Sequence, residues 1–176
     1  LVLKQKIGRC KTVGIDKKGM TLDFFERLKK ELKTTKPKFV NVGEVCARLR
    51  LTKTKEELKR IKTACKITDK IFSKTFIQFK QFKTEADVSA FMIKEANKLG
   101  LEVSFKPIVA SGANAAEPHH GSANKKLRKG FCVIDFGIRY CGYCSDMTRT
   151  IYLGKPTKKE LQIYDLVLDS QQQAIN

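Results

Sequence analysis

The chain has 176 residues, of which 41% are hydrophobic and 9% aromatic, and its formal net charge is +18. This apolar content is sufficient for a packed core and excludes a largely disordered chain. No run approaches the ~18 consecutive apolar residues of a membrane-spanning helix. The basic excess would attract polyanions. Because lysines and acids are interleaved along the chain, we interpret the charge mainly as a solvated surface that could bind nucleic acid non-specifically.

The cysteines and the first residues indicate the compartment. The opening LVLKQKIGRCK becomes charged too early for a secretory signal. Six cysteines are spaced irregularly, at positions 10, 46, 65, 132, 141 and 144. The last two have C-x-x-C spacing, but no second pair follows at the spacing of a structural zinc site. We therefore expect reduced thiols in a cytoplasmic protein.

The first 50 residues predict a strand, a helix and a second strand. Residues 11–16 are typical of a short strand, and residues 19–33 have the periodicity of an amphipathic helix with Thr21 as its N-cap. Pro37 ends that helix, and residues 39–42 predict the next strand. This α/β fragment is too small for a complete domain, so we expect the end of one.

A second region starts near Leu51. The periodicity predicts two amphipathic helices that begin after Thr54 and Thr84, and a last helix that begins after Thr157. The residues at Thr54 and at Thr157 have the pattern of a capping box. A polar loop is expected over 111–124. Strands are expected over residues 105–110, 131–137 and 143–153, with residues 139–142 as a hairpin connection between the last two.

Asp135 and Asp146 are the most informative pair of residues. Asp135 interrupts the apolar VIDFG strand, where an acid is costly unless it is paired or bound to a metal. If the hairpin loop has an even number of residues, Asp135 faces position 146 or 148, and Asp146 points to the same side in either register. Side chains so placed lie within ~5–8 Å of each other. Two carboxylates at that distance repel unless one is protonated or cations lie between them.

Three interpretations of this pair remain open from spacing alone. The acids could hold divalent metals that generate hydroxide for hydrolysis, or they could form a metal-free acid/base couple. They could also simply form salt bridges with Arg139, Arg149 or a nearby lysine. Thr148 shares the face of Asp146 and could hold a carboxylate in place, whereas Arg149 points the other way.

Both histidines of the chain lie in the loop before these strands, in Glu117-Pro-His119-His120-Gly. Adjacent side chains diverge, so at most one of them can point at a given site. A neutral histidine there could bind a metal or donate a hydrogen bond to a substrate carbonyl. The alternative is a loop histidine that is hydrogen-bonded to backbone.

Three segments together resemble the pita-bread metallopeptidases: SGANAAEPHHG, LRKGFCVIDFG and GYCSDMTRTIYLGKPTKKE. This family comprises methionine aminopeptidases, Xaa-Pro aminopeptidases and dipeptidases, and creatinase. The resemblance implies an α/β (α+β) fold in which residues 51–176 are the first half of a pita-bread domain. It also implies that residues 1–50 are the C-terminal remnant of a creatinase-type N-terminal domain, which favours the Xaa-Pro peptidases within the family.

The resemblance further implies roles for individual residues. Asp135 and Asp146 would be ligands of two divalent ions (Mn, Co, Zn or Fe), with Asp146 bridging. His119 would contact the substrate and stabilise the tetrahedral intermediate, with His120 as the less favoured candidate. The family's remaining ligands, a His and two Glu, would lie beyond residue 176. Since two carboxylates offer four oxygens and two metals need about ten positions, we expect the chain alone to be an incomplete, inactive fragment.

The sequence thus predicts a metal-dependent exopeptidase that removes an N-terminal residue from peptide substrates, before proline, by a metal-activated hydroxide. One alternative is a methionine aminopeptidase. Another, of a different class, is a non-catalytic pita-bread protein that binds peptide or RNA. No membrane association is expected, and a homodimer is compatible with this prediction.

Overall fold

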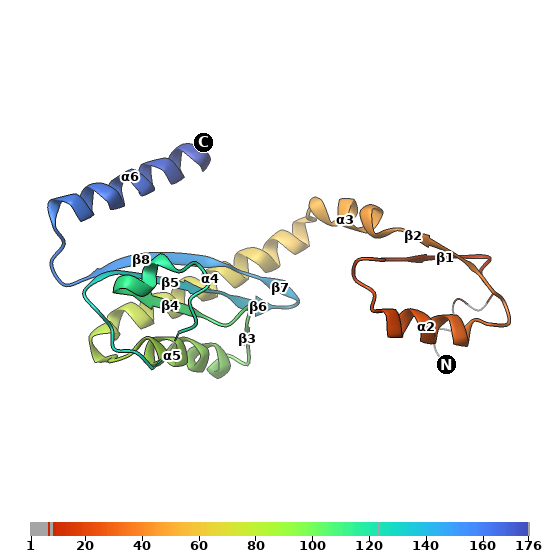
Figure 1. The fold of residues 1–176 in the computed structure, drawn as a ribbon, viewed down its shortest axis with the longest axis horizontal. Helices are drawn as coiled ribbons and strands as arrows, with labels where there is room; N and C mark the ends of the chain where they lie inside the picture. Colours follow the sequence, from red (N-terminus) through yellow and green to blue (C-terminus); the bar gives the residue numbers. More distant parts are fainter. Residues whose placement is uncertain (1–6, 8, 123, 176) are drawn as a thin grey trace. The chain divides into compact units, whose positions relative to one another are not determined.

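The computed structural model describes residues 7, 9–122 and 124–175 of the chain (Figure 1). The chain divides into two compact units, Leu1–Thr54 and Lys55–Asn176.

The first unit is a strand–helix–strand motif, as predicted. Strands β1 (Thr12–Ile15) and β2 (Lys38–Asn41) pair in parallel, and helix α2 (Leu22–Glu31) connects them. Thr21 caps α2 by accepting a 3.3 Å hydrogen bond from the backbone N–H of Phe24. A small core forms between helix and strands, from Val13, Ile15, Leu28 and Leu32. Helix α3 (Gly43–Leu51) follows and was not predicted, because no residue within it is buried to give an apolar face.

Two helices open the second unit. Helix α4 (Lys55–Ile77) buries one stripe of its surface, at Ala64, Thr68, Ile71 and Thr75. A short 3-10 turn, η1 (Phe79–Gln81), leads to α5 (Glu85–Lys98). Thr84 begins α5 with a reciprocal capping box, in which its hydroxyl accepts from the Asp87 N–H and the Asp87 carboxylate accepts from the Thr84 N–H.

Six strands follow and form two three-stranded sheets of antiparallel pairs, in the orders β4-β5-β8 and β3-β6-β7. Helices α4 and α5 cover one face of the β4-β5-β8 sheet (Figure 1). The strands are β3 (Glu102–Val103), β4 (Ile108–Ser111), β5 (Gly130–Phe136), β6 (Ile138–Tyr140), β7 (Tyr143–Cys144) and β8 (Met147–Leu153).

The predicted strand over 143–153 is in fact two strands, β7 and β8. The first half of the predicted connection over 139–142 belongs to strand β6, and only residues 141–142 form a turn. The chain changes sheets at Ser145. Its Oγ accepts a 3.0 Å hydrogen bond from the Ile138 N–H, and it lies 2.6 Å from the Thr68 hydroxyl. The Ser104 hydroxyl donates a 2.7 Å bond to the Ser145 carbonyl. These bonds hold Ser145 in the β3-β6-β7 layer, whereas Met147 already pairs with Phe136 in the other sheet.

The strand predicted over 105–110 was also placed too early. Strand β4 begins at Ile108, directly after Pro107. Proline has no N–H to donate to a strand ladder. The chain before it instead bends, and the N–H of Ser104 donates to the carbonyl of Gly137.

Strand alternation gives the β4-β5-β8 sheet two different faces. The face under α4 and α5 is the core, with Cys132, Ile134 and Phe136 completely buried against Val88 and Met92. The opposite face carries Asp135 of β5 and Thr148 and Thr150 of β8.

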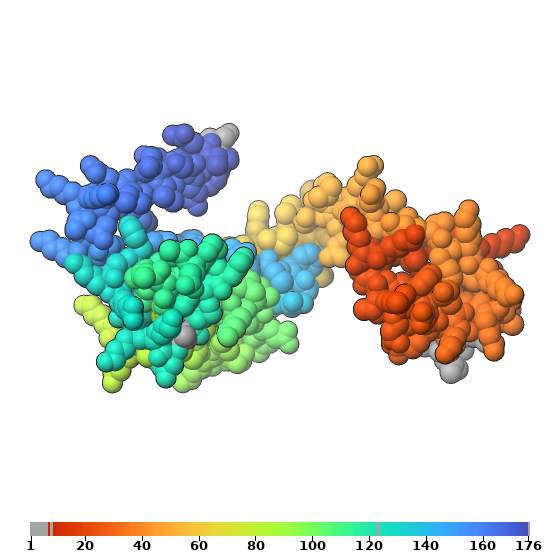
Figure 2. Space-filling model, viewed as in Figure 1, coloured from red at the N-terminus to blue at the C-terminus, as the bar shows by residue number. Residues whose placement is uncertain are grey.

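The last helix, α6 (Lys158–Ile175), has no buried residue in its described part and projects from the unit (Figure 2). No described helix of the structure is both long enough and apolar enough to cross a membrane.

Candidate functional site

Asp135 and Thr148 form the centre of the candidate site, on the face of the sheet opposite α4 and α5. They are direct register partners of β5 and β8. Thr148 Oγ1 donates a 2.9 Å hydrogen bond to Oδ1 of Asp135. The Asp135 side chain is half-buried, and Thr148 is exposed. The hydroxyl therefore orients one carboxylate oxygen of Asp135.

Asp146 lies immediately before β8 and is exposed. Burial raises the pKa of the Asp135 carboxyl, and both the charge of Asp146 and a hydrogen bond with it raise that pKa further, against the opposing bond from Thr148. The two carboxyl groups are therefore close enough to interact. Such a pair is stabilised either by a shared proton or by a cation that both acids bind.

The salt-bridge interpretation finds no support in the described part of the chain. None of the ion pairs found there includes Asp135 or Asp146. Arg149 approaches Asp69 of α4 instead, at 4.0 Å. Arg139 pairs in register with Glu102 and Cys144 and is exposed.

The acid pair supplies only part of a metal site. Within residues 7, 9–122 and 124–175, no group of three or more His, Cys, Asp or Glu side chains could hold a metal ion. Four carboxylate oxygens suit hard divalent cations, but they fall well short of the ligands that two such ions require. The carboxylates of Asp135 and Asp146 could therefore fill only part of the coordination of two such ions.

The two adjacent histidines diverge. The loop after β4 contains a 3-10 turn, η2 (Gly112–Ala116), and then reaches His119, which is exposed. His120 is buried, with its side chain 5% exposed. Its two ring nitrogens lie 2.8 Å from Glu85 and 3.0 Å from Glu117. The His120 ring is thus directed into the protein, and His119 is the histidine available to a ligand.

Glu85 was missed by the sequence analysis. In sequence it appears as an ordinary acid in the first turn of a helix, favourable to the helix dipole. In the structure its side chain is completely buried. The only hint in the sequence is the neighbouring capping box, which fixes where the helix begins and hence where this carboxylate lies.

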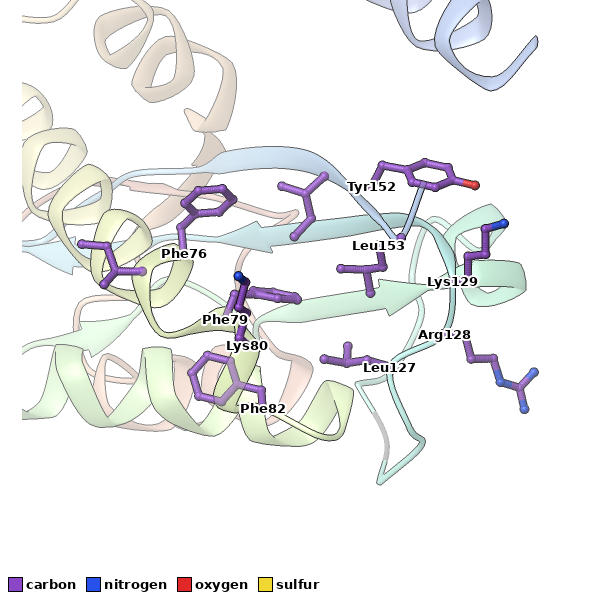
Figure 3. Close-up of a pocket in the computed structure, with 12 residues that line it drawn as sticks. Phe76, Phe79, Lys80, Phe82, Leu127, Arg128, Lys129, Tyr152 and Leu153 are labelled. Carbon is purple, nitrogen blue, oxygen red and sulfur yellow. The ribbon is translucent and has the colours of Figure 1, made fainter. Parts of the chain in front are cut away.

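A hollow of about 930 Å³ lies elsewhere in the second unit (Figure 3). Its walls are mainly apolar, and the charged ends of Arg128 and Lys129 point away from them. Ile151 and Leu153 line it from the face of β8 opposite Thr148, and Tyr152 lines it near the end of the strand. The hollow therefore adjoins the opposite face of the sheet from Asp135 and does not belong to the acid site.

Solved structures and relatives resemble this chain along almost its whole length. The X-Pro aminopeptidase of Thermotoga maritima superposes with a TM-score of 0.86 and 30% identity, covering 97% of this chain and 49% of that one. The Xaa-Pro dipeptidase of Bacillus anthracis superposes with a TM-score of 0.86 and 31% identity, covering 99% of this chain and 50% of that one. In sequence, the Xaa-Pro dipeptidase of Pyrococcus horikoshii is 35% identical over 167 residues, which are 94% of this chain and 47% of that protein.

The chain thus spans about half the length of these relatives. Two family models divide it between them. The creatinase/prolidase N-terminal domain matches residues 1–52, and metallopeptidase family M24 matches residues 59–176. The architecture is that of the pita-bread peptidases, with an N-terminal domain followed by part of the metallopeptidase domain. The chain belongs to metallopeptidase family M24.

Proposed function

We propose that this chain contributes to a metal-dependent exopeptidase that removes the N-terminal residue preceding proline. The observation that carries the proposal is the Asp135–Asp146 pair, which lies on the uncovered face of the sheet with Thr148 bonded to one of its oxygens. Two divalent cations held by these acids and by further ligands would supply hydroxide and polarise the scissile carbonyl. Specificity for Xaa-Pro is supported by the match of residues 1–52 and by the named activities of the relatives.

His119 is proposed to donate a hydrogen bond to the oxyanion of the tetrahedral intermediate. It is exposed, and within the described residues no hydrogen bond holds its side chain, so it is available to a substrate. Loss of one oxyanion donor typically lowers kcat by about 10²–10³-fold. We expect His119→Ala to show a decrease of that order, and His119→Gln to retain part of the activity through its amide N–H.

The test uses the full-length protein loaded with Mn²⁺. Asp146→Ala is expected to abolish hydrolysis of an Xaa-Pro dipeptide and to weaken Mn²⁺ binding measured by calorimetry. Asp165→Ala removes an exposed acid of α6 and serves as the matched control, with wild-type behaviour expected. Wild-type turnover by Asp146→Ala would remove this residue from the mechanism. A Met-Ala-Ser peptide tests methionine specificity, and an Xaa-Pro-Xaa tripeptide separates an aminopeptidase from a dipeptidase.

A second candidate function, binding of RNA, is favoured by one observation. Four lysines recur at helical spacing on α4 and line a shallow depression of about 500 Å³, namely Lys55, Lys59, Lys62 and Lys66. All four are exposed, and none takes part in the ion pairs of the described residues. If each neutralises one phosphate of single-stranded RNA, log K should fall against log salt with a slope of about −3. If the slope of log K against log salt stays the same when all four lysines are replaced by glutamine, this surface is not the RNA-binding site.

A further inference from the structure

Glu85 is a buried carboxylate that does not belong to the acid pair. It is the first residue of α5 and is completely enclosed. Its Oε1 accepts hydrogen bonds from the Ser111 N–H at 2.8 Å, the Ser111 hydroxyl at 3.0 Å and the Asn114 amide at 2.9 Å. Its Oε2 lies 2.8 Å from Nε2 of His120. One side chain of α5 thus holds the end of β4, at Ser111, and the loop after it, at Asn114 and His120.

His120 is held by carboxylates on both sides. Nε2 faces Glu85, and Nδ1 lies 3.0 Å from Oε2 of Glu117. A neutral imidazole has only one N–H, so one carboxylate would face a ring lone pair. Only the imidazolium donates to both. A protonated His120 ring would therefore satisfy both acids, of which Glu85 is enclosed and Glu117 has its side chain 68% exposed.

The rest of the loop is fastened at its two ends. Ser122 Oγ accepts a 2.7 Å bond from the Val109 N–H and donates a 3.0 Å bond to the Pro107 carbonyl. The Arg128 N–H donates to Ser111 Oγ at 3.2 Å. His119 lies between Glu117 and His120, two residues whose side chains are bonded to each other, so its own backbone is constrained from both directions.

We propose that His120, clamped between Glu85 and Glu117, is a positioning residue that fixes the backbone from which His119 reaches the substrate. This inference rests on the proposed function of His119. The clamp is internal to the second unit, and it contacts neither Asp135 nor Asp146. Its contribution to the reaction therefore passes through the geometry of His119 and not through the metal ligands.

The experiment compares Glu85→Gln with Glu117→Gln in the full-length, Mn²⁺-loaded protein, with Xaa-Pro dipeptide as the substrate. Each variant removes one carboxylate charge beside His120, but only Glu85 anchors the loop to α5. A displacement of about 1 Å at a catalytic group can cost 10²-fold in rate. We expect Glu85→Gln to lower kcat by about 10–100-fold with KM changed less than threefold. Glu117→Gln leaves the bonds of Glu85 to Ser111, Asn114 and His120 in place and should lower kcat by less than Glu85→Gln does.

A double-mutant cycle with His119→Ala separates positioning from general damage. If the clamp acts through His119, Glu85→Gln should have almost no further effect in the His119→Ala background, because coupled residues are not additive. Additive losses would overturn the proposal. If Glu85→Gln does not fold, His120→Gln takes its place in the cycle, with the same two outcomes.

A spectroscopic readout accompanies the kinetics. The ¹⁵N shifts of the His120 ring should show two protonated nitrogens in the wild type, and one protonated nitrogen, Nδ1, in Glu85→Gln. A neutral His120 in the wild type at pH 6 would overturn the clamp. A wild-type protein without any Xaa-Pro hydrolysis would instead refute the proposed function, an outcome that is seen before any variant is measured.

Discussion

Thr148 lies directly opposite Asp135 in the β5–β8 ladder and donates a 2.9 Å hydrogen bond to its Oδ1. The ladder pairing brings these two side chains together, and the hydroxyl then restricts the rotation of the carboxylate. A carboxylate that is already oriented loses less conformational freedom when it binds a cation. Partners of this kind typically contribute 10–100-fold to metal affinity or activity.

Thr148→Val should therefore weaken Mn²⁺ binding by about tenfold or more, because valine keeps the shape of threonine but has no donor. Thr148→Ser keeps the hydroxyl and should remain within about threefold of wild type. Thr150→Val is the matched control, since Thr150 is on the same face of β8 but pairs with Val133. Calorimetric titration of the full-length protein measures all three. Equal affinities for Thr148→Val and Thr150→Val would show that the hydroxyl does not orient Asp135.

The relation between the two acids could be predicted from the sequence because, for a connection with an even number of residues, it depends only on the two-residue period of a strand. In an antiparallel pair joined in this way, Asp135 opposes position 146 or 148, and either register places the three side chains of Asp135, Asp146 and Thr148 on one face. The structure has the second register. The prediction did not require knowing where the strands end.

The break at Ser145 could not be predicted by the same reasoning. Its hydroxyl partner is Thr68, 77 residues earlier, and no local pattern reports a hydrogen bond of that range. The burial of Glu85 could not be predicted for the same reason, because its partners Ser111, Asn114 and His120 are 26 to 35 residues away. Periodicity reports which face a residue occupies, but not which distant polar group it meets.

Gly137→Ala should be severely destabilising. A Cβ at Gly137 would overlap the backbone carbonyl of Ser145 and lie 2.7 Å from the Ser104 hydroxyl. Backbone cannot rotate away as a flexible side chain does, so we expect a loss of about 3 kcal/mol in the free energy of unfolding, the upper end for overpacking. Urea unfolding followed by circular dichroism measures it. Gly121→Ala is the control, because nothing lies within 4 Å of the added Cβ, and a change within about 0.5 kcal/mol is expected.

The clamp around His120 should make stability depend on pH in a defined window. Burial opposes ionisation of Glu85, but hydrogen bonds from Asn114, Ser111 and His120 hold its pKa below 4.5. The stability that Glu85 contributes to the folded state is therefore present above pH 4.5 and is lost as the pH falls through the native pKa. Hydrogen bonds to Glu117 and Glu85 raise the pKa of His120 above 6.5, against burial. Its contribution is complete below pH 6.5 and is lost as the pH rises through the native pKa.

The free energy of unfolding should therefore differ most between wild type and His120→Gln from about pH 4.5 to 6.5. A difference of about 1–3 kcal/mol is expected there, as for a hydrogen bond to a charged group, and it should shrink at higher pH. Urea titrations at pH 5, 6, 7, 8 and 9 would measure it. A difference that stays constant or grows above pH 7 would mean that His120 is neutral between its two carboxylates.

Cys132 should be the least reactive of the six thiols, all of which are free. It is completely buried under α4 and α5, and burial, with a smaller contribution from the charge of Glu85, raises its pKa to about 12. The thiolate is the reactive form of a cysteine. With a pKa of about 12, fewer than about one in a thousand Cys132 side chains is ionised at pH 8.

Iodoacetamide at pH 8, followed by peptide mapping, should label the five exposed cysteines while Cys132 stays unmodified until urea unfolds the protein. Gly137→Ala provides a sensitive comparison, because loosening of this sheet should speed the labelling of Cys132 and leave the rates at the exposed thiols unchanged. Native-state labelling of Cys132 as fast as that of Cys141 would show that the face of the sheet under α4 and α5 is open to solvent.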